Sequence, residues 1–170
     1  MRDVTHPYRK LEQRIPEDIA ILNARADADG VNRQTPPTAI IAEHHGYGRS
    51  GNEVYKDIKV LEAIGKLAAW PPGQLKYKGY AVMPAAEIDE PMIQIALEIM
   101  AAERAIKNIT DNVRQLGKLA LESDEHGSLF VVSHMIINLE NLEGSLVPFK
   151  DRLRQLGGVG MKLARLSDQN

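Results

Sequence analysis

The fold is decided by residues 89–122, which read DEPMIQIALEIMAAERAIKNITDNVRQLGKLALE. The segment begins with two acidic residues followed by Pro91, an arrangement typical of the start of a helix. Apolar residues then recur at alternating intervals of three and four, which is the pattern of a coiled-coil helix. The pattern predicts one long helix that ends near Leu121 or Glu122.

The same apolar spacing resumes after a polar turn at residues 123–128 and continues to Leu156. Pro148 lies inside this second stretch and predicts either a kink or a break into two helices that share a face. Gly157 and Gly158 are expected to end the helix, leaving residues 161–170 as a short tail. Two long helices joined by a short turn predict an antiparallel hairpin.

The two predicted helices carry more apolar residues than pairing within one hairpin can bury. A wide apolar face indicates more than one partner surface. We therefore expect the chain to form a homo-oligomer, with a dimer that makes a four-helix bundle as the favoured form. The residues predicted to form this oligomer seam are Ile99, Ile106, Ile109, Val113, Leu116, Val132, Met135, Leu139, Leu142 and Leu146.

Before the hairpin, the chain is interrupted by prolines and mixes short helical and strand-like segments. Helices are predicted at residues 7–14, 16–28 and 52–70, strands at 38–42 and 74–83, and a loop at 31–37. The predicted organisation is an N-terminal region (1–84), the hairpin (85–157) and a C-terminal tail (158–170). The predicted fold class is mainly α, a long coiled-coil-like antiparallel helical hairpin with a small α/β or irregular N-terminal region.

Composition excludes several classes of protein. The 170 residues contain no cysteine, so the chain has no disulfide framework, thiolate metal site or cysteine nucleophile. A formal net charge of −2 excludes a strongly basic nucleic-acid-binding protein. The chain has no apolar run of the length, about 18 residues, that spans a bilayer. We expect a cytoplasmic protein that contacts neither membrane nor nucleic acid.

One motif indicates a ligand. Residues 46–51 read GYGRSG and fit G-x-G-x-x-G between a strand-like run and a predicted helix, the context of a phosphate-binding loop. The predicted ligand-binding residues are Gly46, Tyr47, Gly48, Arg49, Ser50 and Gly51. Residues 43–45 separate the strand-like run from the first glycine, and no acidic residue ends the next strand, so a dinucleotide-binding fold is not expected. The alternative interpretation is a surface loop that precedes an ordinary helix N-cap.

His44 and His45 follow Glu43 and suggest a metal site, but neighbouring residues on an extended segment point to opposite faces. No Glu-x-x-His pair is present, which argues against a carboxylate-bridged di-metal bundle. We therefore expect no metal, no cofactor and no catalytic residue. If the protein is an enzyme, a general base is most reasonably sought at one of these two histidines beside Arg49.

The sequence supports two hypotheses for function. The first is a non-enzymatic adaptor or inhibitor that assembles through a helical bundle and contacts a protein partner. The alternative is a binding module for a phosphorylated small molecule such as a nucleotide, held by residues 46–51.

Overall fold

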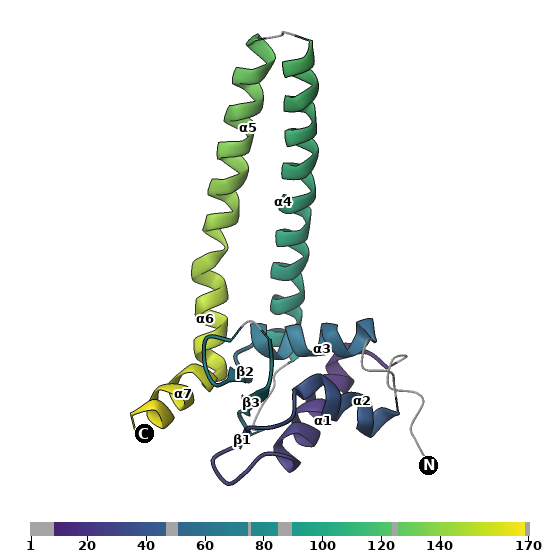
Figure 1. Ribbon diagram of the computed structural model, residues 1–170, viewed down its shortest axis with the longest axis vertical. Helices are drawn as coiled ribbons and strands as arrows, with labels where there is room; N and C mark the ends of the chain where they lie inside the picture. Colours follow the sequence, from purple (N-terminus) through teal and green to yellow (C-terminus); the bar gives the residue numbers. More distant parts are fainter. Residues whose placement is uncertain (1–8, 47–50, 75, 85–89, 124–125, 169–170) are drawn as a thin grey trace. The chain divides into compact units, whose positions relative to one another are not determined.

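The computed structural model describes residues 9–46, 51–74, 76–84, 90–123 and 126–168, which are mainly helical with a small antiparallel sheet (Figure 1). The predicted fold class is confirmed. The chain divides into two compact units, one formed by Met1–Ala96 with Asp151–Asn170 and the other by Leu97–Lys150. None of the described helices combines the length and apolarity needed to cross a membrane.

In the first unit, α1 (Leu11–Ala24) packs against α2 (Pro37–His45) and α3 (Asn52–Ala63). The predicted division of α1 at Pro16 is wrong, because the helix continues through that residue. Proline removes one backbone hydrogen bond. This loss is offset by burial of Ile15, Ile19 and Leu22, which are fully enclosed on one face of α1.

Residues 38–42 were predicted as a strand and lie instead in α2. Pro37 occupies the first turn of this helix, where its missing N–H has no intrahelical partner to lose and its fixed φ suits the helix. The helix ends at Gly46, whose φ of 76° lies in the left-handed region that favours glycine. The apolar run is thus a short buried helix, with Ile40 and Ile41 facing the core.

The sheet contains β1 (Val31–Asn32), β2 (Leu67–Trp70) and β3 (Gly79–Val82) in the order β1–β3–β2. Both pairings are antiparallel, with Val31 opposite Ala81 and Leu67 opposite Val82. The strand predicted at 74–83 is confirmed in part as β3. Two expectations are wrong, because β1 lies in the predicted loop and β2 takes residues assigned to the helix. Gly65, with a φ of 69°, turns the chain between α3 and β2.

The predicted tail is wrong, because α7 (Val159–Ser167) follows Gly158, whose φ of 82° allows a sharp turn. Val159 packs with Val31 and Ala81, and its N–H donates to the Gly65 carbonyl at 2.9 Å. The chain approaches so closely here that a Cβ on Gly157 would lie 1.9 Å from the Ile64 carbonyl oxygen. The C-terminal helix is therefore part of the first unit's core.

The hairpin consists of α4 (Glu90–Glu122), α5 (His126–Ser145) and α6 (Val147–Gly157). The predicted bounds of α4 are confirmed within a residue or two. Of the two alternatives at Pro148, the break is observed, since α5 ends at Ser145 and α6 begins at Val147. Within Leu97–Lys150, α4 and α5 run antiparallel side by side (Figure 1), and Lys150 forms an ion pair with Glu103.

The two helices pair through only half of the predicted seam. Ile106 and Val113 are buried at 6% and 4% exposure, and Gly117 lies against Val132, whose Cγ1 is 3.0 Å from where a Cβ would stand. Thr110 is also buried, so the contact surface of α4 follows Ile106, Thr110, Val113, Gly117 and Ala120. At Gly117, the absence of a side chain leaves room for Val132 of α5. From α5 and the start of α6, the half-buried residues are Leu129, Val132, Ile136, Leu139 and Leu146.

Candidate functional site

Four of the ten predicted seam residues are exposed. Ile109 and Leu116 on α4 are 49% and 56% exposed, and Met135 and Leu142 on α5 are 42% and 52% exposed. The other seam residues, including Ile99, are buried or half-buried. These four form the centre of a surface that we call the apolar face, which also includes Leu119 of α4, Val131 of α5 and Phe149 of α6.

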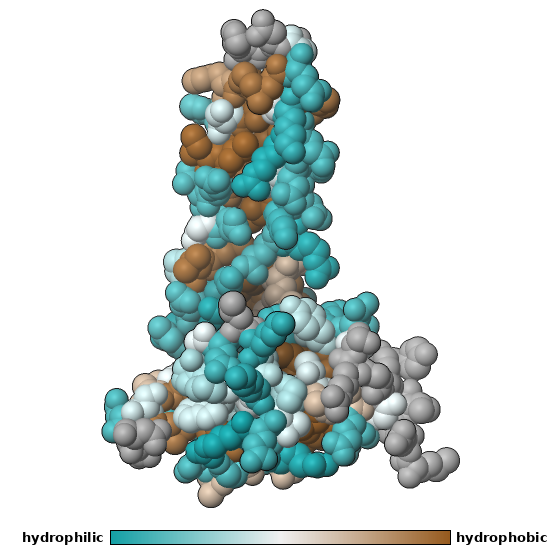
Figure 2. Space-filling view, in the orientation of Figure 1, coloured by the Kyte–Doolittle hydropathy of each residue, from teal (hydrophilic) through white to brown (hydrophobic). Residues whose placement is uncertain are grey.

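The residues of the apolar face share one side of the hairpin. On α4, Ile109, Leu116 and Leu119 are offset to the same side of the buried row. On α5 and α6, Val131, Met135, Leu142 and Phe149 are offset in the same sense. On both helices, these residues lie on the side reached by turning backward along the chain from the buried row. Because the two helices run antiparallel, these two sides face the same direction. The hairpin therefore presents a row of hydrophobic side chains on one side. Figure 2, which views one face of the molecule, shows hydrophobic patches on the surface of the hairpin, interspersed with hydrophilic side chains.

The opposite flank of α4 is charged. Lys107, Asp111, Arg114 and Lys118 are all exposed there, and Arg114 lies 3.6 Å from Asp111. This flank is suited to water. Ile109, Leu116 and Leu119 thus lie on the side of α4 away from these charged residues, whereas Leu121, near the end of the helix, is exposed on the charged flank.

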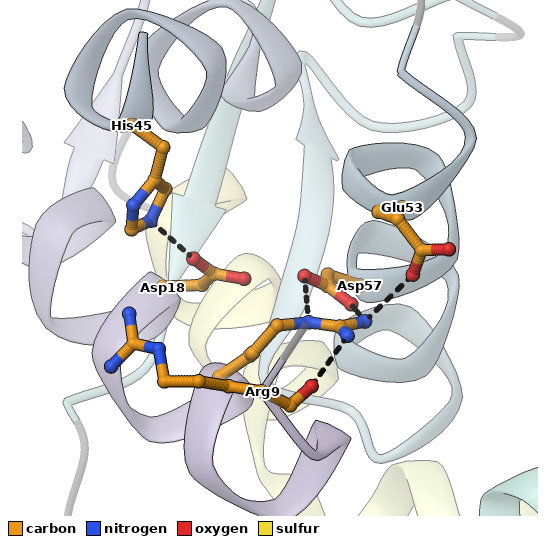
Figure 3. A network of polar contacts seen from close by, with 6 residues as sticks. Arg9, Asp18, His45, Glu53 and Asp57 are labelled. Carbon is orange, nitrogen blue, oxygen red and sulfur yellow. Dashed lines mark hydrogen bonds and ion pairs between the residues drawn. The ribbon is translucent and has the colours of Figure 1, made fainter. Parts of the chain in front are cut away.

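The first unit contains a buried network of charged side chains (Figure 3). Arg14 of α1 donates two hydrogen bonds to Asp57 of α3, from Nη2 to Oδ1 at 2.5 Å and from Nε to Oδ2 at 3.1 Å. Both side chains are nearly inaccessible, at 5% and 0% exposure. Burial lowers the pKa of Arg14, but the hydrogen bond and charge of Asp57, with Glu53, outweigh it and raise the pKa. The Arg14 guanidinium therefore stays charged.

Asp18 of α1 completes this network. Burial, the charge of Asp57 and a hydrogen bond with Asp57 raise the pKa of Asp18 to about 9, so its carboxyl group is neutral at pH 7. Figure 3 shows the carboxyl groups of Asp18 and Asp57 pointing toward one another. On its other side, Asp18 Oδ1 lies 3.3 Å from Nε2 of His45, and both side chains are fully buried. The network thus links α1, α2 and α3.

Sequence reasoning missed this network, although a signal was present. Asp18 occupies a helical position between Ile15 and Leu22, and Asp57 lies between Val54 and Leu61. An ionisable residue within a buried apolar stripe requires a partner. The partners are 39 residues apart along the chain, so only the fold brings them together.

The two histidines are arranged differently from the expectation. Because residues 44 and 45 lie in the last turn of α2, and not on an extended segment, their rings point to neighbouring directions, with centroids 4.9 Å apart. Glu17 of α1 joins them, and its carboxylate and one nitrogen of each ring lie within 4.8 Å of one another. The expectation that the two histidines point to opposite faces of an extended segment is therefore wrong.

The glycine-rich motif lies mostly outside the described residues, which include only Gly46 and Gly51; Tyr47, Gly48, Arg49 and Ser50 are not among them. Gly46 ends α2 and Gly51 precedes α3, so the expected strand before the motif is absent. Glu53 occupies the first turn of α3, where its charge already complements the helix N-terminus. Ligand binding by this loop stays a prediction.

A cavity of about 1110 Å³ opens in the first unit between α3, β2, the chain before β3, and α7. Its lining includes the cations Lys59, Lys76 and Arg154. Lys59 Nζ lies 2.7 Å from a Glu62 oxygen, and Arg154 pairs with Asp151 at 3.8 Å. The volume is slightly above the range of about 300–1,000 Å³ that is typical of small-molecule sites.

Comparison with known proteins gives no relative: no protein-family model, no curated protein and no solved structure matches this chain.

Proposed function

We propose that this protein is a non-enzymatic assembly protein that associates with itself through the apolar face of its helical hairpin. The observation that supports this proposal is the exposure of seven large apolar side chains on one side of α4, α5 and α6. Soluble monomers rarely leave so large a contiguous apolar surface uncovered. A second copy is the occupant that fits best, because a hairpin placed against its own copy makes a four-helix bundle.

The energy available supports a stable contact. The seven side chains are between 42% and 66% exposed, equivalent to about four whole apolar side chains. Their burial contributes roughly 6–11 kcal/mol per copy, or about 12–22 kcal/mol for a dimer. Association costs about 4–15 kcal/mol in lost freedom of motion. The apolar face is thus large enough to hold a dimer together.

Within this proposal, the first unit presents the surface that contacts a protein partner in the cytoplasm, as an adaptor or inhibitor does. Self-association through the hairpin would place two such units in one assembly, which raises the effective concentration of each for a multivalent partner.

Cysteine labelling tests which side of the hairpin is covered. The chain has no cysteine, so each introduced thiol is unique. Asn112 lies between Ile109 and Leu116 on the apolar side of α4, whereas Lys118 lies on the charged flank; both are exposed. We expect maleimide to react with N112C more slowly as protein concentration rises from about 1 to about 100 µM, while K118C reacts at a constant rate. Equal, concentration-independent rates would contradict the proposal.

A second candidate function, binding of a phosphorylated small molecule, is favoured by the cavity of the first unit. Arg154 lines this cavity and Arg152, on the same helix, does not. Calorimetry with a panel of nucleotides should show binding that is weakened in R154A and unchanged in R152A. If no nucleotide binds, or if both variants bind equally well, this candidate function is excluded.

A further inference from the structure

A second site lies where α1 meets the end of α2, in the first unit. Glu17 comes from α1, and His44 and His45 are the last two residues of α2. One carboxylate and two imidazoles, with donor atoms within 4.8 Å of one another, form a set of ligands that a transition metal prefers. We propose that Glu17, His44 and His45 bind one divalent transition-metal ion, and that Zn²⁺ is the ion whose ligand preference they match.

Small side-chain rotations bring the three donors to bonding distance. Three atoms within 4.8 Å of one another surround a point no more than about 2.8 Å from each, against about 2.1 Å for a Zn–N bond. The difference of about 0.7 Å is within reach of rotamer adjustment. His44 is exposed and Glu17 is half-buried, so both side chains have room to move toward the buried His45.

The surroundings of His45 resemble the second layer of residues around known metal ligands. Its Nε2 is held by Asp18 at 3.3 Å, and the carboxyl group thereby fixes the orientation of the ring. We assign ligation to Nδ1, with the Asp18 carboxyl group as the outer partner that orients the ring, as hydrogen-bonded partners do for metal-bound histidines in many zinc sites. The site also lies at the C-terminal end of α2, where the helix dipole favours a cation.

Arg9 competes with the metal for Glu17. Its Nη2 lies 2.5 Å from Glu17 Oε2, and a metal ion that takes this carboxylate must displace the guanidinium. Metal binding therefore exchanges one cation for another at Glu17. This gives the site a distinctive property, since removal of the Arg9 charge should strengthen metal binding. The three ligands leave a fourth position of a tetrahedral ion for water or a further ligand.

Isothermal titration calorimetry of the full-length, tag-free protein with Zn²⁺ tests the proposal. We expect one ion per chain and no response to Mg²⁺, which prefers oxygen ligands in octahedral geometry. H44Q should weaken Zn²⁺ binding by about 100-fold, since even outer-layer partners contribute about 10–100-fold. H134Q is the matched control, because His134 is an exposed histidine on α5. H134Q should bind Zn²⁺ as the wild type does.

Two further measurements separate ligation from adventitious binding. R9Q should bind Zn²⁺ more tightly than the wild type, and X-ray absorption at the zinc edge should show nitrogen and oxygen neighbours at about 2.0–2.1 Å. Thermal melting of each variant checks that the fold is retained; His44 is exposed, so H44Q should melt as the wild type does. Equal affinity of H44Q and H134Q, absence of one-to-one binding, or weaker binding by R9Q would each overturn the proposal. The inference does not depend on self-association.

Discussion

Replacing Leu116 with aspartate should separate the copies without unfolding them. Leu116 lies at the centre of the apolar face and is 56% exposed within one chain. Its neighbour Gln115 is also exposed, but it is polar, lies outside the apolar face and is about 100° around α4 from Leu116. Q115D therefore introduces the same residue one position earlier and serves as the matched control.

The expected loss of association free energy counts each substitution twice, because a two-fold dimer contains two copies of the changed residue. Each L116D removes about 1–1.5 kcal/mol of apolar burial at the contact, since a little over half of the side chain remains to be covered. Each aspartate also loses water around its charge, which costs about 1–3 kcal/mol when partial compensation occurs. The total, about 4–9 kcal/mol, corresponds to a dissociation constant raised by about a thousandfold or more.

Sedimentation velocity across a range of protein concentrations measures this effect, with thermal melting monitored by circular dichroism as the check on folding. We expect L116D to sediment as a monomer at concentrations where wild type and Q115D sediment as dimers. The helix content of all three should agree, since exposed substitutions of this kind change stability by about 0.5 kcal/mol. If L116D and Q115D associate equally well, the apolar face is not the contact between copies.

Three further predictions concern the stability of single units. D57N removes the fully buried carboxylate that pairs with Arg14 and leaves Arg14 beside the more exposed Glu53, and it should cost about 3–5 kcal/mol of unfolding free energy in urea titrations. G117L should destabilise the hairpin by about 1–3 kcal/mol because the pairing leaves no space there, whereas G144A, at an open helical position, should stabilise it by about 0.5–1 kcal/mol. Burial raises the pKa of Tyr80 to about 12. The contribution of its neutral phenol to folding stability is therefore fully present below pH 10 and is lost as the pH rises toward 12. The folding stability of Y80F should fall less over this alkaline range.

The sequence predicts α4 well because its signals are local and repeated. Acidic residues and Pro91 mark its start, and apolar spacing over many turns outweighs any single residue. The prediction of which residues lie between α4 and α5 was correct only in part. Only large hydrophobic side chains were expected in the contact, whereas the buried row of α4 combines Ile106 and Val113 with Thr110 and Gly117. Ile109 and Leu116 lie outside this row.

The errors in the first unit come from short apolar runs and from glycines. Residues 38–42 are rich in β-branched side chains, and a run of that length fits a strand or a buried helix equally well. Gly158 was interpreted as the end of regular structure, but its left-handed conformation only turns the chain into α7. The network around Arg14 and Asp57 could not be placed from the sequence, since its members lie on separate helices.

Sedimentation equilibrium of the wild-type protein measures whether two copies of the chain associate. The chain has a mass of 18.9 kDa. Self-association through the apolar face predicts a species of twice that mass in the micromolar range, in reversible equilibrium with the monomer. A single species of 18.9 kDa at every concentration up to about 100 µM would show that the apolar face of the hairpin does not bind a second copy.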